Sequence, residues 1–146
     1  MGANNDAGSA LYNPRNEPSF ATSFLYNYVP RIQWKTVNQS RATVDAYYSG
    51  ALPSWLIWNL IGLYPVTSQP IYVLSAPLFS SLKIKLFDVG PFATELKILA
   101  PGLSTSDYYP QSVTLNGQKR NTSWISHSQL PEGGSLVFEM GAEPGN

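Results

Sequence analysis

The stretch Leu82-Lys83-Ile84-Lys85-Leu86 alternates strictly between apolar and basic residues. Because successive side chains of a strand point to opposite faces of a sheet, this pattern predicts a half-buried β-strand. Asn116-Gly117 is the dipeptide that a type I′ hairpin turn prefers, and Gly133-Gly134 supplies a second turn. Short runs rich in apolar, β-branched or aromatic residues predict further strands at 71–74, 95–99, 112–115 and 136–140. Residues 65–146 are therefore expected to form an antiparallel β module.

Upstream of residue 65 the apolar residues recur at helical spacing instead. A first helix is expected after Asn16 and Pro18, and a second, amphipathic helix is expected to run to about Ser49. Residues 55–63 are apolar nearly all round, with Asn59 as the polar exception, which indicates a helix buried in a larger helical assembly. Residues 1–64 are thus read as a helical segment that evolved inside a longer chain.

Composition narrows the possible functions of the 146-residue chain. Nine Lys and Arg balance nine Asp and Glu, which argues against a nucleic-acid binder with a basic stripe. The sequence holds no cysteine, which excludes a disulfide framework and a cysteine-based metal site. No apolar run reaches the ~18 residues that would predict a membrane span. The N-terminus shows no secretory signal pattern, and the compartment stays open.

Charged residues make up only 12% of the chain, against a typical ~25%. Such a composition suits a sugar-handling protein or a piece of a larger body. Glu17 lies in the first turn of the first predicted helix, where a carboxylate complements the helix dipole. The same carboxylate could also face a polar cleft and bind a sugar hydroxyl or a hard cation.

The aromatic and histidine candidates each have a structural and a functional interpretation. His127 stands close to Trp124 and is expected to be a hydrogen-bonded packing element rather than a base. Trp34, Trp55 and Trp58 could stack on sugar rings, but their helical spacing in apolar stretches favours a core role.

Two tripeptides match the acceptor pattern for N-linked glycosylation. They are Asn38-Gln39-Ser40 and Asn121-Thr122-Ser123. Such patterns are common by chance, and these two would matter only if the chain enters the secretory pathway.

Seven motifs along the chain carry a resemblance to a known family. In order they read NEPSF (16–20), FLYNYVP (24–30), PSWLIWNLIGLYPV (53–66), YVLSAPLFSSLKI (72–84), QSVTLNG (111–117), SWISHSQL (123–130) and GGSLVFEM (133–140). Their order and content resemble the C-terminal part of glycoside hydrolase family 92, the exo-acting α-mannosidases. The resemblance covers about residues 12–141.

The resemblance implies a fold, an activity and a cofactor. The expected fold class is α+β, with N-terminal helices from an incomplete (α/α)6 barrel followed by the antiparallel β module. Family members remove terminal α-mannose from glycans by inverting hydrolysis that depends on calcium. The family's Asn-Glu-Pro-Ser motif matches residues 16–19, which implies that Asn16 and Glu17 bind the substrate and that Glu17 also binds the metal. Mannose-containing glycans are then the expected partners, with neither nucleic acid nor membrane.

The sequence departs from the family at the catalytic base. The family has a Gly-Asn-x-Asp-x-Gly loop just before the helix that matches 54–63, whereas here Ser49 runs directly into Gly50. The general acid of the family lies upstream of the matched part, so no catalytic residue is assigned and the chain alone is expected to be inactive. Two alternatives remain open. The β half could be a non-catalytic carbohydrate-binding or packing module, or a coding segment could be missing at Ser49-Gly50.

Overall fold

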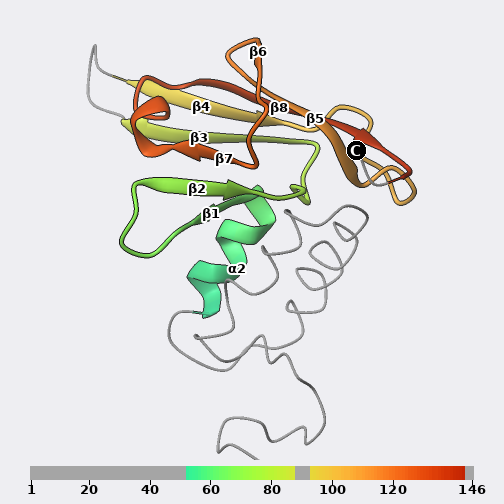
Figure 1. The fold of residues 1–146 in the computed structure, drawn as a ribbon, viewed down its shortest axis with the longest axis horizontal. Coiled ribbons are helices and arrows are strands. Elements are labelled where there is room, and N and C mark those ends of the chain that lie inside the picture. The colour runs from blue at the N-terminus through green and yellow to red at the C-terminus, as the bar shows by residue number, and fades with distance from the viewer. Residues whose placement is uncertain (1–51, 88–92, 144–146) are drawn as a thin grey trace, which may run out of the picture.

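The computed structural model describes residues 52–87 and 93–143. Its regular elements are strands, apart from one α-helix at its start and one short 3-10 helix (Figure 1). The elements in chain order are α2 (Leu52–Ile61), β1 (Leu63–Pro65), β2 (Ile71–Leu74), β3 (Ser81–Phe87), β4 (Thr94–Leu99), β5 (Tyr109–Leu115), β6 (Gln118–Lys119), β7 (Trp124–Ser126), the 3-10 helix η4 (His127–Gln129) and β8 (Gly134–Gly141). Of the helical barrel segment predicted for residues 1–64, residues 1–51 lie outside the described residues, so the division at residue 64 stays a prediction.

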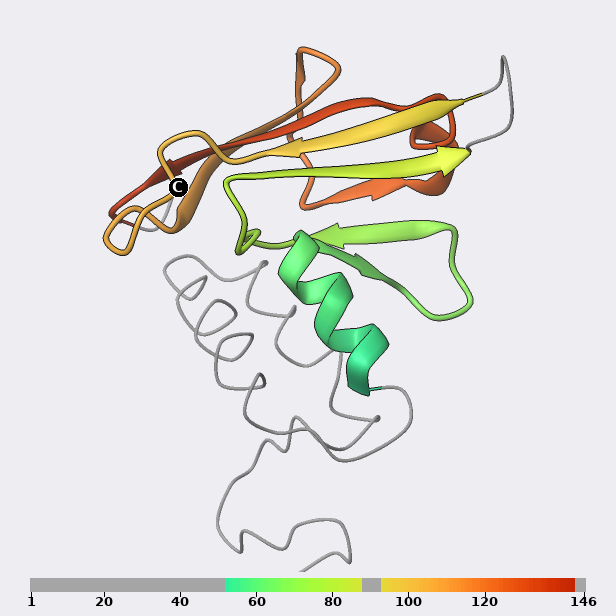
Figure 2. The same ribbon diagram turned by 180° about the vertical axis from the view of Figure 1, so that it is seen from behind.

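Two sheets make up the β part. A three-stranded sheet has the order β1-β2-β7 with antiparallel pairs throughout. A five-stranded sheet has the order β3-β4-β8-β5-β6. Figures 1 and 2 show α2 next to β1 and β2 at one end of the described part, and the β5-β6 hairpin at the opposite end.

The prediction of a purely antiparallel module is wrong in one pairing. Strand β8 pairs with β4 in parallel, with Leu96 opposite Gly134 and Leu99 opposite Val137. It pairs with β5 in the antiparallel sense, so the sheet is mixed. A parallel neighbour needs a long crossover connection, and here residues 100–133, which include β5, β6 and β7, provide it.

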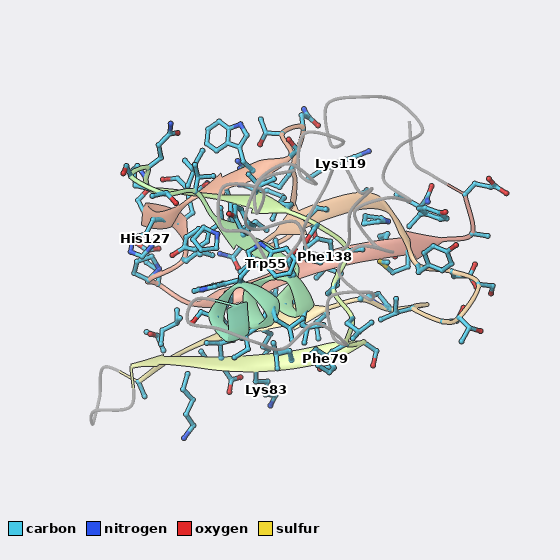
Figure 3. All side chains as sticks on the ribbon, turned by 90° about the horizontal axis from the view of Figure 1, so that it is seen from below. Trp55, Phe79, Lys83, Lys119, His127 and Phe138 are labelled. Atoms are coloured by element: carbon cyan, nitrogen blue, oxygen red, sulfur yellow. The ribbon has the colours of Figure 1, made fainter. Side chains whose placement is uncertain are left out.

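One apolar core fills the space between the two sheets. Phe138 and Leu136 of β8 are fully buried, together with Leu96 and Ile98 of β4 (Figure 3 labels Phe138). Across from them the three-stranded sheet contributes residues such as Ile125 to the same cluster. Burying a side chain of this size contributes about 1.5–3 kcal/mol to folding, so β8 is a large part of the core's stability.

The alternating stretch of residues 82–86 forms part of β3 and has the half-buried pattern that the sequence predicts. Leu82, Ile84 and Leu86 are partly buried and pack against the core cluster, whereas Lys83 and Lys85 are exposed. A strand with one face in the core and one in solvent produces this alternation.

Helix α2 ends earlier than the sequence pattern predicts. The expected helix over residues 55–63 stops at Ile61, because Gly62 takes φ +86 and its N–H bonds to the Asn59 carbonyl. A Cβ at Gly62 would lie 2.7 Å from the Ser75 carbonyl oxygen, so the chain can turn here only with glycine. The early end frees Leu63 to begin strand β1.

The faces of α2 differ in burial, although the helix is apolar nearly all round. Trp55 and Leu56 are buried, and Asn59 is buried with its side-chain amide donating to the Trp55 carbonyl at 2.7 Å. Ile57 is 56% exposed. No helix among the described residues is long and apolar enough to cross a membrane.

The hairpin turn predicted from Asn116-Gly117 is confirmed. Asn116 has φ +52 and Gly117 has φ +78, as a type I′ turn requires. The Asn116 side-chain oxygen accepts a hydrogen bond from the Ser135 N–H at 2.8 Å, and its own N–H donates to the Ser135 carbonyl. These two bonds tie the turn to the start of β8.

We expect alanine to be more destabilising at Gly133 than at Gly102, a glycine with a similar backbone conformation. Gly133 and Gly102 have φ of +75 and +81, so alanine carries a similar left-handed strain of about 1 kcal/mol at either site. At Gly133 the new Cβ would also lie 2.7 Å from the Glu95 carbonyl oxygen, whereas at Gly102 nothing lies within 4 Å. Gly133→Ala should therefore lower the free energy of unfolding by about 1–3 kcal/mol more than Gly102→Ala. Urea unfolding measures the difference, and equal losses would contradict the backbone clash.

Tyr109 gives the fold a dependence on alkaline pH. Burial, the hydrogen bond that Tyr109 donates to the Tyr108 hydroxyl and the nearby charges together raise the pKa of Tyr109 to about 12. Since an unfolded tyrosine has a pKa near 10, the unfolded chain loses this proton first, and stability falls as the pH rises above about 10. Tyr109→Phe should make that fall smaller by about 1 kcal/mol, allowing for solvent screening. Urea unfolding at pH 8 and pH 11 measures it, and an unchanged pH slope would contradict the assignment.

Candidate functional site

The two site residues predicted from the sequence, Asn16 and Glu17, lie outside the described residues. Their roles therefore stay predictions. The described part can still be searched for metal donors, polar pockets and aromatic clusters that could take part in a site.

The described residues offer no cluster of metal donors. In 52–87 and 93–143, no group of three or more His, Cys, Asp or Glu residues could hold a metal ion. The residues in hand thus do not form a calcium site by themselves, and no step of a reaction is derived through calcium.

His127 belongs to an aromatic cluster with Tyr72 and Trp58. Its Nδ1 lies 2.8 Å from the Tyr72 hydroxyl, and the two rings are 5.8 Å apart between centroids. Tyr72 in turn lies 5.6 Å from the ring of Trp58 on α2. Burial raises the pKa of Tyr72, and the tautomer of His127 decides which of the two groups donates. The cluster joins α2, β2 and η4, as a packing element does.

Trp55 and Trp58 have the core role that their spacing in the sequence favours. Trp55 is buried in a small cluster with Leu56, and Trp58 packs against the main core. Trp34 lies outside the described residues. Trp124, by contrast, is 37% exposed on β7.

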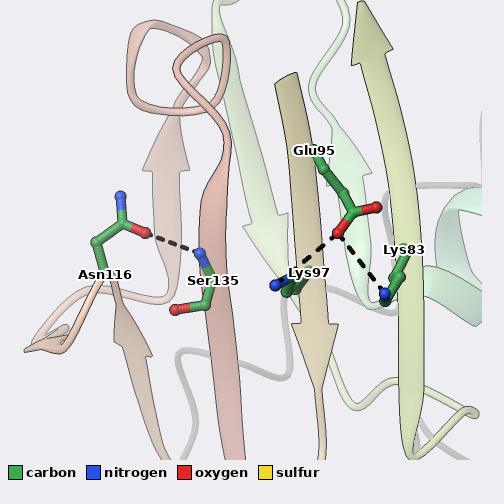
Figure 4. A network of polar contacts seen from close by, with 5 residues as sticks. All are labelled: Lys83, Glu95, Lys97, Asn116 and Ser135. Atoms are coloured by element: carbon green, nitrogen blue, oxygen red, sulfur yellow. Dashed lines mark hydrogen bonds and ion pairs between the residues drawn. The ribbon is translucent and has the colours of Figure 1, made fainter. Parts of the chain in front are cut away.

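An open pocket of about 350 Å³ lies on the outer side of the five-stranded sheet. Its lining residues are Glu95, Lys97, Asn116, Gly134 and Ser135. They come from β4, from the β5-β6 turn and from the start of β8, and Figure 4 shows the polar contacts among them.

Glu95 is the centre of the charges at this pocket. Its Oε1 lies 3.9 Å from the Lys83 Nζ and 4.0 Å from the Lys97 Nζ (Figure 4). All three side chains are well exposed, so each ion pair contributes only ~0–1 kcal/mol. Among the described residues, Glu95 is the single carboxylate that lines this pocket, whereas inverting glycoside hydrolysis needs two carboxylates roughly 6.5–9.5 Å apart. The pocket can hydrogen-bond a polar ligand, but its described lining does not provide the acid–base pair of a glycosidase.

The sequence did not predict this pocket. Its residues are distant along the chain and come together through the parallel β4-β8 pairing. The Asn116-Gly117 turn was the one local signal, but it does not reveal which strand lies beside it.

A second polar group occupies the loop before β5. Asp107 accepts hydrogen bonds of 2.8 Å from the hydroxyls of Ser106 and Ser104, which lower the pKa of its carboxyl. The Asp107 N–H also bonds to the Ser104 hydroxyl at 2.9 Å. These hydrogen bonds are all within the loop, and they stabilise a turn at Ser104 to Asp107.

The sequence has relatives among curated and structurally known proteins. The Glycosyl hydrolase family 92 catalytic domain matches residues 2–142. An "uncharacterized secreted glycosidase" of the fungus Arthroderma benhamiae is 31% identical, over 88% of this chain and 18% of its own length. The chain thus spans about a fifth of the length of that relative.

Solved structures of the same family share the fold. A family GH92 α-mannosidase from Bacteroides thetaiotaomicron, in complex with mannoimidazole, is 27% identical with a TM-score of 0.72, covering 88% of this chain and 18% of that one. The family GH92 inverting mannosidase of the same bacterium is 26% identical with a TM-score of 0.71, covering 88% of this chain and 19% of that one. With the family match extending over nearly the whole sequence, the chain belongs to glycosyl hydrolase family 92.

Proposed function

We propose that this chain is part of an exo-α-mannosidase that removes terminal α-mannose from glycans by inverting, calcium-assisted hydrolysis. The family match carries the proposal, because its range of residues 2–142 includes the Asn16-Glu17 motif and strand β8. The likeness to an inverting mannosidase and to an α-mannosidase with bound mannoimidazole supports α-mannose as the substrate class.

In this proposal Asn16 and Glu17 are the chain's contribution to the substrate site. A carboxylate and an amide oxygen are ligands that calcium accepts, and calcium also binds vicinal sugar hydroxyls. When bound, the ion would help to hold the sugar ring near its transition-state shape. Its remaining ligands would come from outside the described residues, which hold no donor cluster of their own.

The proposal also states that the chain alone does not turn over substrate. Its sequence runs directly from Ser49 to Gly50 where the family has the aspartate loop that supplies the general base. The acid belongs to a part of the family that this sequence does not match. Each missing proton transfer lowers the rate about 100- to 10,000-fold.

The turnover test uses the full chain with an α-mannoside and Ca²⁺. We expect no release of mannose above a blank, because neither proton-transfer group is present. A circular-dichroism spectrum and a cooperative unfolding transition confirm that the sample is folded. Release that disappears with a chelator and with Glu17→Ala, but persists in the matched surface variant Glu139→Ala, would contradict the inactivity. It would leave the assignment of Glu17 standing.

One observation supports a second function, that of a packing module. Ile57, Leu78 and Phe79 are 56%, 38% and 44% exposed, an unusual feature for large apolar side chains. The Leu78 N–H bonds to the Leu60 carbonyl at 3.0 Å, which places Leu78 at the last turn of the helix that carries Ile57. An apolar surface at the α2 end suits a module that covers another part of an enzyme better than one that binds a hydrophilic glycan.

A glycan-binding assay separates packing from carbohydrate binding. If the β part only packs, the full chain carrying Glu17→Ala should not be retained on immobilised mannan in the presence of a chelator, because the exposed apolar residues offer no hydroxyl partners. Binding that Trp124→Ala abolishes, while Phe79→Ala leaves it intact, would instead establish a carbohydrate-binding module with Trp124 as the stacking residue.

A further inference from the structure

The segment Asn121-Thr122-Ser123 joins β6 to β7, and the proposed function makes no use of it. Asn121 and Thr122 are both exposed. The tripeptide has the Asn-x-Ser/Thr pattern that the oligosaccharide-transferring enzyme of the secretory pathway recognises. Whether such a pattern is an acceptor depends on where the fold places the asparagine.

Backbone hydrogen bonds hold the two ends of this segment in place. On one side the Arg120 N–H bonds to the Val113 carbonyl of β5 at 2.8 Å. On the other side the Ser123 carbonyl accepts from the Leu74 N–H of β2 at 2.7 Å. The segment therefore crosses from the five-stranded sheet to the three-stranded sheet. Asn121 and Thr122 lie between the two anchors.

The surroundings leave room for a bulky substituent. The four residues Asn116 to Lys119, which form the neighbouring hairpin tip, are all exposed. In Figure 2 the β5-β6 hairpin projects at the end of the described part that lies away from α2. The hairpin that directly precedes Asn121 thus lies away from helix α2.

We propose that Asn121 is an acceptor for an N-linked oligosaccharide. In the transfer, Asn121 Nδ2 forms a bond to the anomeric carbon of an oligosaccharide supplied on a lipid diphosphate. The bond from that carbon to the phosphate oxygen breaks. The amide gives up one proton, and the lipid diphosphate is the leaving group, so no oxidant or reductant is required. The Ser123 hydroxyl, two residues after the asparagine, supplies the recognition element of the acceptor pattern.

With this modification, the β6 end and the α2 end of the described part have different roles. A hydrated glycan at the β6 end keeps that end in solvent, whereas the apolar residues at the α2 end remain available for packing. The inference does not depend on mannosidase activity, and it holds for an inactive chain as well.

The test is translation of the full chain, with a cleavable secretion signal added, in the presence of endoplasmic-reticulum microsomes. Only the chain that the microsomes protect from added protease is scored. All variants carry Asn38→Gln, which removes the other acceptor pattern. We expect the Asn38→Gln chain to migrate as a larger species that an endoglycosidase returns to the unmodified size.

Three further variants assign the modification to this segment. Adding Asn121→Gln or Ser123→Ala should abolish the larger species. Adding Ser123→Thr should retain it, because threonine keeps a hydroxyl at the position that the acceptor pattern requires. A reporter glycoprotein in the same reaction shows that the microsomes are active. A protected Asn38→Gln chain without the larger species, or one that keeps it after Asn121→Gln, would overturn the proposal.

Discussion

The burial of β8 between β4 and β5 is the interaction on which the rest of the described structure depends. Phe138 and Leu136 are fully buried, and they contact residues from both sheets through one continuous cluster. Without β8, the β3-β4 pair and the β5-β6 pair would have no common neighbour. The last of the described strands therefore joins the β3-β4 pair to the β5-β6 pair, both of which precede it in the sequence.

The entry into β8 shows how a local constraint supports this long-range pairing. Gly133 passes so close to the Glu95 carbonyl that a side chain does not fit, and this close approach sets β8 beside β4. The Asn116 side chain then bonds to the Ser135 backbone and sets β8 beside β5. The same contacts bring Glu95 and Asn116 to one pocket, so the polar surface of this sheet is a consequence of its topology.

Local features of the fold were predictable from the sequence, whereas the long-range pairing was not. The alternation of Leu82, Ile84 and Leu86 with lysines indicated which face of β3 is buried. Asn116-Gly117 indicated the turn that joins β5 to β6. Both signals act over a few residues, where sterics and amphipathicity decide the outcome. The parallel pairing of β4 with β8 depends on contacts across more than thirty residues, and no periodicity encodes it. For the site, a family resemblance pointed to Asn16 and Glu17, and their roles remain a prediction.

We propose that this member of a glycoside hydrolase family has lost one catalytic loop. The chain belongs to glycosyl hydrolase family 92, and its described part folds like the corresponding part of two mannosidases. We propose that it retains the Glu17 motif and lacks the aspartate loop between Ser49 and Gly50. Sequencing the transcript across the Ser49-Gly50 junction tests that loss most directly. The account predicts a message in which the codon for Gly50 follows that for Ser49 without interruption. A message that carries an additional segment encoding an aspartate-bearing loop at this junction would contradict it.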